Sequence, residues 1–108
     1  MLIIFQFDGV LHPDGTQYVP TRAWRDLFNA INNAQKFIYI TGWSVYTDTK
    51  LLRGDDDPEG MSHVGELLKR KADEGVRVLM LVWNERSSNA LKHEGMMGTH
   101  DEDTRIFF

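Results

Sequence analysis

The chain has 108 residues, of which 42% are hydrophobic and 26% charged, a composition typical of one soluble globular domain. Its 16 acidic and 12 basic residues give a net charge of -4, which argues against a nonspecific nucleic-acid-binding protein. The chain has no cysteine, which excludes disulfides, thiolate metal sites and a cysteine nucleophile. No apolar run reaches the ~20 residues that span a bilayer, and the N-terminus lacks the basic start of a signal peptide, so we expect a cytoplasmic protein.

The chain divides into a short irregular start and a longer alternating part. Residues 1–17 are predicted to be irregular, with a candidate short strand at Leu2–Phe7 that the turn residues Asp8-Gly9 end. Residues 18–108 alternate patterns that are typical of helices and of buried strands. The expected organisation is therefore an N-terminal segment, 1–17, and one α/β unit, 18–108.

The first helix-and-strand pair is predicted near the start of that unit. Apolar residues three and four positions apart indicate a helix that starts at Pro20-Thr21. Its inward face comprises Trp24, Leu27, Phe28, Ile31 and Ala34. The following Lys36–Thr41 is β-prone and apolar on both faces, which suits a strand of a parallel sheet that helices cover.

The pattern then repeats. Residues 47–61 are polar and contain Gly and Pro, so we expect a long loop, after which Ser62 caps a helix that Gly75 ends. Val76–Trp83 is the clearest buried strand, and Thr99–Glu102 is a capping box that predicts a third helix. In the second helix the residues expected to face inward are Val64, Leu67, Leu68 and Ala72, and those largely outward are Lys69, Arg70 and Lys71.

These elements predict an α/β fold: an open, mostly parallel sheet of two or three strands with helices packed on it. The apolar helix face and the two apolar strands are able to bury their surface from water only by packing against each other. Their apolar residues therefore form the expected core. That core is Trp24, Leu27, Phe28, Ile31, Phe37, Ile38, Ile40, Leu67, Leu68, Val78, Leu79, Leu81 and Val82.

Ligands of such sheets bind at the carboxyl ends of the strands. The candidate substrate-binding residues at these ends are Trp43, Ser44, Trp83, Asn84 and Arg86. The two indoles suit a quaternary ammonium group through cation–π contact, and Arg86 suits a phosphate anion. Plain packing of the indoles is the alternative, because each buries a large area.

Five segments of this unit carry a family resemblance. They are Ala23–Ile31, Ile38–Tyr46, Gly65–Lys69, Glu74–Trp83 and Thr99–Glu102. In these segments, which lie between Tyr18 and Phe107, the chain resembles the plant-type phospholipase D family. The resemblance implies a partial phospholipase D-like catalytic domain at 18–108, in a family that hydrolyses phosphatidylcholine-type phospholipids to phosphatidic acid. It also implies a phospholipid or membrane surface as partner, and a membrane-peripheral location besides the cytoplasmic one.

The family's chemistry is implied to rest on two motifs of the form His-x-Lys-x-x-x-x-Asp. One histidine attacks phosphorus, the other is the general acid, and the lysines hold phosphate oxygens. Neither motif is present, because no lysine stands two residues after His12, His63, His93 or His100. We assign no catalytic residue and expect the opening part of a catalytic domain, inactive alone. A non-catalytic interaction module stays open as an alternative, and so does a half-domain whose partner is the missing remainder of the domain.

An acidic stretch approaches the spacing of a calcium-binding loop. Its candidate metal ligands are Asp55, Asp57, Glu59 and Glu66. Against calcium, Glu59 replaces the usual Asp or Asn, Ser62 replaces an aliphatic residue, and no helix precedes the loop. A hydrated acidic loop is the alternative. We expect no other cofactor in this chain; calcium is also a cofactor that the family resemblance implies.

The run Ile3–Leu11 offers a third reading. It resembles the first motif of haloacid-dehalogenase phosphatases, an apolar strand followed by Asp-x-Asp-Gly-Val. Gln6 occupies the place of the nucleophilic aspartate. Because an amide cannot form the aspartyl-phosphate, such a relative would be a degenerate, inactive phosphatase.

Overall fold

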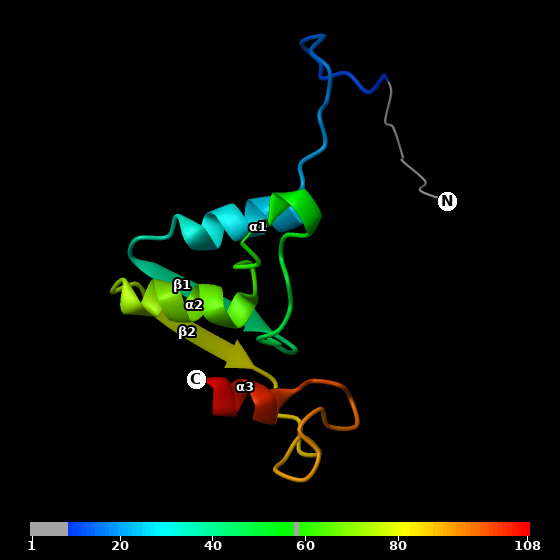
Figure 1. The fold of residues 1–108 in the computed structure, drawn as a ribbon. Helices are drawn as coiled ribbons and strands as arrows, with labels where there is room; N and C mark the ends of the chain where they lie inside the picture. The colour runs from blue at the N-terminus through cyan, green and yellow to red at the C-terminus, as the bar shows by residue number, and fades with distance from the viewer. Residues whose placement is uncertain (1–8, 58) are drawn as a thin grey trace.

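The computed structural model describes residues 9–57 and 59–108 (Figure 1). The candidate strand Leu2–Phe7 and Gln6 lie outside the described residues, and the division at residue 17 stays a prediction. The elements in chain order are α1 (Ala23–Asn32), β1 (Phe37–Gly42), the 3-10 helix η1 (Gly54–Asp56), α2 (Val64–Asp73), β2 (Arg77–Val82) and α3 (Asp101–Phe107). Within the described part, no helix has the length and apolarity that a bilayer crossing requires.

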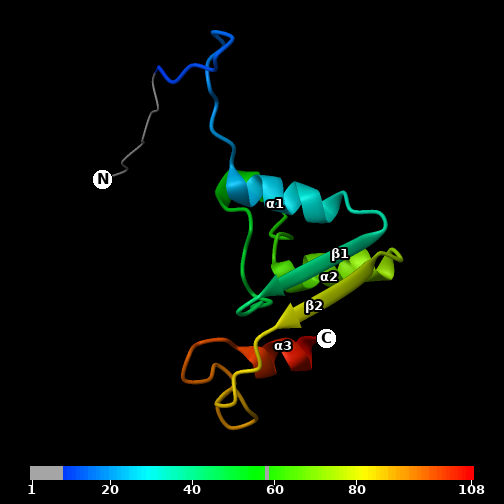
Figure 2. The same cartoon turned by 180° about the vertical axis from the view of Figure 1, so that it is seen from behind.

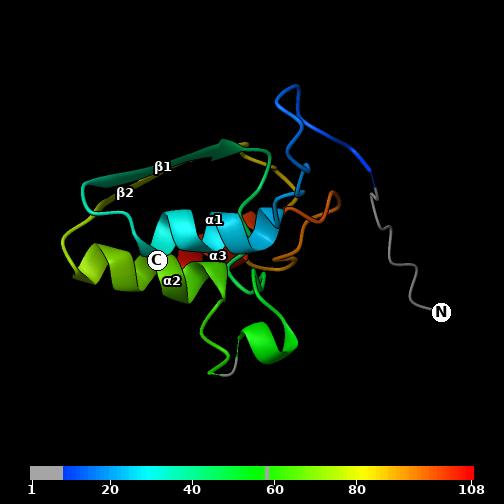
Figure 3. The same ribbon diagram turned by 90° about the horizontal axis from the view of Figure 1, so that it is seen from above.

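The α/β class and the parallel sheet are confirmed. β1 and β2 pair in parallel, with Phe37 opposite Arg77 and Gly42 opposite Val82. Seen from above, α1 and α2 lie side by side on the same face of this two-stranded sheet (Figure 3). Seen from behind, the other face of the sheet has no helix on it (Figure 2). The fold is therefore one layer of helices on one face of an open sheet.

The core lies between the helix layer and the sheet. Its buried members are Ile31, Ile38, Leu51, Leu67, Leu68 and Val76, and the partly buried Phe28, Ile40, Val78 and Met80 pack against them. Leu67 and Leu68 are completely buried. The predicted core is thus confirmed on the inward face of α2, at the C-terminal end of α1 and on alternate residues of both strands.

The prediction was wrong for two residues of α1 and for three residues on the face of the sheet that points away from the helices. Trp24, Leu27, Phe37, Leu79 and Leu81 are all exposed, by 43% to 67%. A continuous apolar strand indicates burial on both faces, but the described chain covers only one. Since side chains alternate along a strand, every second residue of β1 and β2 points away from the helices.

Lys71 shows a second difference. It was expected on the outward face of α2, with Ala72 inward, yet Lys71 is buried and Ala72 is exposed. The Lys71 ammonium donates to the backbone carbonyl of Asn32 at 3.0 Å and pairs with Glu74. A cation there satisfies a carbonyl at the C-terminal end of α1 and interacts favourably with its helix dipole.

The helix caps also differ from those expected. α1 is capped by Arg22 and α2 by His63, in both cases without a side-chain hydrogen bond. The hydroxyl of Ser62 instead lies 2.7 Å from the Asp57 carboxylate and accepts the Leu52 amide at 3.0 Å. The serine therefore fastens the long loop rather than starting the helix.

α2 approaches its neighbours closely at Gly65. A Cβ atom at this position would lie 2.7 Å from the Cβ of Thr47 and 2.9 Å from the ring of Phe107. The absence of a side chain thus allows α2, the segment after β1 and α3 to meet at one point.

Hydrogen bonds attach the C-terminal part to the ends of the strands. Ser44 donates to the Thr99 carbonyl and Thr104 donates to the Val45 carbonyl, both at 2.5 Å. The backbone amide of Glu85 donates to Asp101 at 2.8 Å. These bonds hold the segment that follows β2, and α3 after it, under the carboxyl edge of the sheet.

The predicted capping box is wrong. α3 begins after His100, whose backbone is left-handed with φ 55°, and neither His100 nor Thr99 caps the helix with its side chain. The amide of Glu102 is bound by the Ser88 hydroxyl at 2.9 Å instead of by Thr99. A residue distant in sequence thus supplies the contact that a local motif was expected to make.

Two carboxylates order the segment before α3. The Glu85 carboxylate accepts the amide of Ser87 at 2.8 Å and its hydroxyl at 2.5 Å, which lowers the pKa of Glu85. Asp103 lies 2.7 Å from the Nδ1 atom of His100 and 2.8 Å from that of His93. These hydrogen bonds lower the pKa of Asp103, with the His100 contact as the larger cause.

We expect Leu67→Ala to lower the free energy of unfolding by about 2–5 kcal/mol, because the side chain is fully buried and its removal leaves a cavity. Leu91→Ala is the matched control, since Leu91 is 98% exposed and its loss should cost less than about 0.5 kcal/mol. Urea unfolding followed by circular dichroism measures both. Equal stabilities of the two variants would contradict the described core.

We also expect acid to loosen the segment around Glu85. A carboxylate whose pKa is lowered on folding stabilises the fold above its ordinary pKa, 4.5 for Glu85 and 3.8 for Asp103, and this contribution is lost as the pH falls through the lowered value. Amide hydrogen exchange of Ser87 should therefore accelerate below about pH 4 after correction for the intrinsic rate. Glu85→Gln should already exchange fast at neutral pH, whereas the exposed Glu94→Gln should match the parent. An unchanged exchange rate in Glu85→Gln would refute this role.

Candidate functional site

Two indole rings mark the carboxyl edge of the sheet. Trp43 directly follows β1 and Trp83 directly follows β2, so the parallel pairing brings them together. Their ring centroids are 5.7 Å apart and their planes differ by 2°, an offset-stacked arrangement. Both indoles are more than half exposed. The stacked pair therefore presents aromatic surface at the edge where ligands of parallel sheets bind.

A shallow groove of ≈ 440 Å³ surrounds this pair. It is lined by Trp43, Trp83, Asn84, Glu85, Arg86 and Met97. Four of the five candidate substrate-binding residues thus share one groove. The fifth, Ser44, is half-buried and its hydroxyl is engaged with the carbonyl of Thr99.

The groove offers complementary chemistry. An indole face attracts a cation, and Trp is the strongest of the aromatic residues in this respect. The Arg86 guanidinium is exposed and suits phosphate oxygens through paired hydrogen bonds. The arrangement is therefore able to accommodate a group that carries both a positive and a negative charge.

Sequence reasoning missed Glu85 and Met97 as lining residues. Glu85 is buried, and it shapes the groove by accepting the Ser87 hydrogen bonds described above. The sequence holds no specific signal for this role, because local side-chain-to-backbone hydrogen bonds of this kind are characteristic of Ser, Thr, Asn and Asp rather than Glu. Met97 lies 14 positions after Trp83, and no local pattern connects the two.

No described histidine lines the groove. His93 and His100 share the carboxylate of Asp103, and the His100 ring stacks on Tyr46 with centroids 4.1 Å apart. The Nδ1 atom of His63 lies 3.1 Å from the carbonyl of Asp48. That none of these histidines is catalytic stays a prediction.

The candidate calcium ligands are not gathered into one site. Among the residues that the structure describes, no three His, Asp or Glu side chains are arranged to hold a metal ion. Asp57 is engaged by Ser62 and by the Met61 amide at 2.9 Å, while Asp55, Glu59 and Glu66 are exposed. In this arrangement the four carboxylates do not fit calcium, and calcium binding stays a prediction.

Comparison with known proteins finds relatives over most of the chain. The model of the phospholipase D family matches residues 30–108, well over half of the chain and all of the groove. Phospholipase D alpha 1 of Oryza sativa subsp. japonica is 57% identical over 98 residues, which are 88% of this chain and 12% of that protein. Phospholipase D alpha 1 of Brassica oleracea var. capitata is 58% identical over 97 residues, with 87% and 12% coverage.

The chain therefore spans about 12% of the length of the curated relatives that it matches. The family model covers the last three residues of α1 and all of β1, η1, α2, β2 and α3. The identity to these relatives, 57% and 58%, is far above what chance similarity produces. The chain belongs to the plant-type phospholipase D family.

Proposed function

We propose that this chain supplies part of the catalytic-domain scaffold of a phospholipase D that hydrolyses phosphatidylcholine-type phospholipids to phosphatidic acid and a free alcohol. The observation that supports this most directly is the groove at the carboxyl ends of β1 and β2. It lies where a parallel sheet binds its ligand, inside the segment that the family model matches.

In this proposal the groove residues position the substrate. Arg86 binds the phosphate oxygens, and the outer faces of Trp43 and Trp83 contact the quaternary ammonium of the headgroup. Ser44 acts indirectly, because its bond to the Thr99 carbonyl keeps the segment after β1 beside the segment before α3. Substrate binding at this edge would place the phosphodiester next to the sheet.

The bond-breaking groups are proposed to come from outside these 108 residues. None of the four histidines has a lysine two positions later, so the sequence offers no nucleophile paired with its phosphate-holding cation. Positioning a ground state without a nucleophile and a general acid leaves the phosphodiester barrier almost unchanged. Catalysis therefore requires further polypeptide.

The open face of the sheet supports this requirement. We define it as the surface formed by Phe37, Tyr39, Leu79 and Leu81, all at least half exposed. Together with the neighbouring indoles these side chains form a contiguous apolar patch, in contrast to the single exposed apolar residues that are normal on a protein surface. A parallel sheet is normally covered on both faces, so the remainder of the catalytic domain is the proposed cover. An interaction module without activity would use the same face, and only an activity assay separates the two.

We expect the isolated chain to bind a hydrophobic dye through the open face. Leu81→Lys should lower the dye fluorescence at least severalfold without lowering stability, because Leu81 is 62% exposed and packs against little. Met96→Lys is the control, since Met96 is 81% exposed but lies outside the sheet. Dye fluorescence that is absent, or that both variants reduce equally, would contradict an uncovered sheet face.

We expect no choline release from phosphatidylcholine micelles by the chain alone, with or without calcium. The same sequence placed in Oryza sativa phospholipase D alpha 1, in exchange for the matching segment, should support choline release. In this chimera Trp43→Ala or Trp83→Ala should raise the KM about threefold to tenfold, as expected for loss of a cation–π contact.

Leu91→Ala in the chimera is the control and should leave KM and kcat unchanged. An inactive but folded chimera would contradict the scaffold role. Turnover by the isolated chain that His93→Ala or His100→Ala abolishes would contradict the external origin of the catalytic groups.

A further inference from the structure

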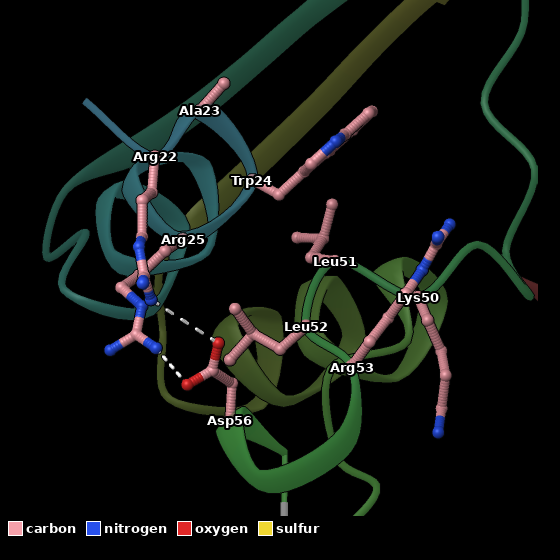
Figure 4. A pocket seen from close by; sticks show the side chains of 9 residues that line it. All are labelled: Arg22, Ala23, Trp24, Arg25, Lys50, Leu51, Leu52, Arg53 and Asp56. Atoms are coloured by element: carbon pink, nitrogen blue, oxygen red, sulfur yellow. Dashed lines mark hydrogen bonds and ion pairs between the residues drawn. The ribbon is translucent and has the colours of Figure 1, made fainter. Parts of the chain in front are cut away.

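A second pocket lies away from the strand-end groove, between the N-terminus of α1 and the segment before and within η1 (Figure 4). It has a volume of ≈ 490 Å³. We call it the basic pocket; its lining residues with roles below are Arg22, Trp24, Arg25, Lys50, Arg53 and Asp56. None of them belongs to the groove at Trp43 and Trp83.

The basic pocket concentrates positive charge in an acidic chain. Four cationic side chains and a single carboxylate line it, whereas the whole chain has a net charge of -4. Figure 4 shows Arg22 and Arg25 on one side and Lys50 and Arg53 on the other. Such a local excess of cations over carboxylates creates a positive potential that attracts anions.

Asp56 neutralises only part of this charge. Its carboxylate is hydrogen-bonded by Arg25 and lies 3.8 Å from the Arg22 guanidinium, and the bond from Arg25 lowers the pKa of Asp56. Lys50 is 3.9 Å from Asp57, and Arg53 forms no ion pair within the described residues. Asp56 thus holds two guanidinium groups in place and leaves positive charge for a ligand.

Backbone and side-chain donors reinforce the site. No side chain caps α1, so amide groups of its first turn have no partner from a capping residue, and the helix dipole favours an anion there. The Nε atom of Arg25 is buried and has no hydrogen-bond partner among the described residues. The donors exceed the acceptors in this pocket.

The pocket also has an apolar wall. The indole of Trp24 is 62% exposed beside the buried Leu51 and the half-buried Leu52. In Figure 4 the Trp24 side chain lies near Leu51 and extends away from Arg22 and Arg25. An anion with an adjoining apolar part would therefore contact the cations and the apolar wall at once. A cluster of cations that served only to form salt bridges would not require this apolar wall.

We propose that the basic pocket binds the phosphate group of an anionic ligand, independently of the strand-end groove. Arg22 provides the exposed charge beside the N-terminus of α1, Arg53 adds positive potential from the opposite side of the pocket, Asp56 keeps Arg25 oriented, and Trp24 contacts the apolar part. A phosphomonoester lipid headgroup and free phosphate share this chemistry, and the two probes below distinguish them. The opposing explanation is that the cations only fasten η1 to α1.

The test compares two double variants of the 108-residue chain. Arg22→Gln/Arg53→Gln removes two exposed cations from the pocket, and Arg77→Gln/Lys92→Gln removes two exposed cations elsewhere, so both variants have the same net charge. The first probe is inorganic phosphate, followed by titration calorimetry. The second is co-sedimentation with phosphatidylcholine vesicles that contain phosphatidic acid, with pure phosphatidylcholine vesicles as reference.

We expect the pocket variant to weaken phosphate-dependent binding by about tenfold or more, because Arg22 contributes a charge-assisted hydrogen bond and Arg53 a positive potential. The control variant should bind like the parent. High salt should weaken binding as well. Binding to phosphatidic acid vesicles alone assigns the lipid source, and binding of inorganic phosphate alone assigns the soluble source.

Equal losses in both double variants, equal binding to both kinds of vesicle, or no binding of either probe would overturn the proposal. Urea unfolding shows whether Arg22→Gln/Arg53→Gln remains folded. Choline release by the chimera tests a different site, so a failure here leaves the proposed function standing and the reverse also holds.

Discussion

The molecule depends on the packing of two helices against a single face of a two-stranded parallel sheet. Leu67 and Leu68 contribute the fully buried side chains of this layer, and Ile31 and Ile38 complete it from α1 and β1. A two-layer arrangement of this size buries a small core. The radius of gyration, 17.6 Å, exceeds the roughly 13 Å of a compact chain of similar length, partly because residues 9–21 extend away from the core (Figure 1).

The groove depends on a different kind of interaction. The segment that follows β2 and the helix α3 are attached mainly by directional hydrogen bonds, such as Ser44 to Thr99 and Thr104 to Val45, rather than by the apolar core. Directional bonds fix an orientation that apolar contacts leave free. The relative placement of Trp83, Asn84 and Arg86 therefore depends on hydrogen bonds between buried and half-buried polar groups. The strength of those hydrogen bonds varies with the ionisation of the Glu85 and Asp103 carboxyl groups.

Much of this fold follows from the sequence. Periodicity located both long helices and both strands to within three residues, because a 3.6-residue repeat and a short apolar run each have one structural meaning here. The position of the groove was predictable, because the carboxyl ends of parallel strands lie at the same edge of a sheet and Trp43 and Trp83 directly follow those ends. The haloacid-dehalogenase-like run lies largely outside the described residues, and that interpretation stays a prediction.

What local patterns could not predict is which neighbour each side chain meets. Phe37 and Leu81 are as apolar as Ile38, yet they face the uncovered side of the sheet. Lys71 is buried because a carbonyl of α1 needs a donor, and that carbonyl lies 39 residues away in sequence. The basic pocket was missed for the same reason, since α1 and the segment near η1 each supply only part of its charge.

The close approach at Gly65 has a consequence for how this sequence can vary. Exposed positions of α2, such as Glu66 and Lys69, accept a range of side chains, because substitutions there meet few neighbours. At position 65 even a single methyl group would overlap Thr47 and Phe107, which lie on separate segments of backbone. No compensating change at one neighbour relieves both overlaps. A larger residue at position 65 would therefore require Thr47 and Phe107 to shift together. This one position couples the spacing of α2, α3 and the segment after β1.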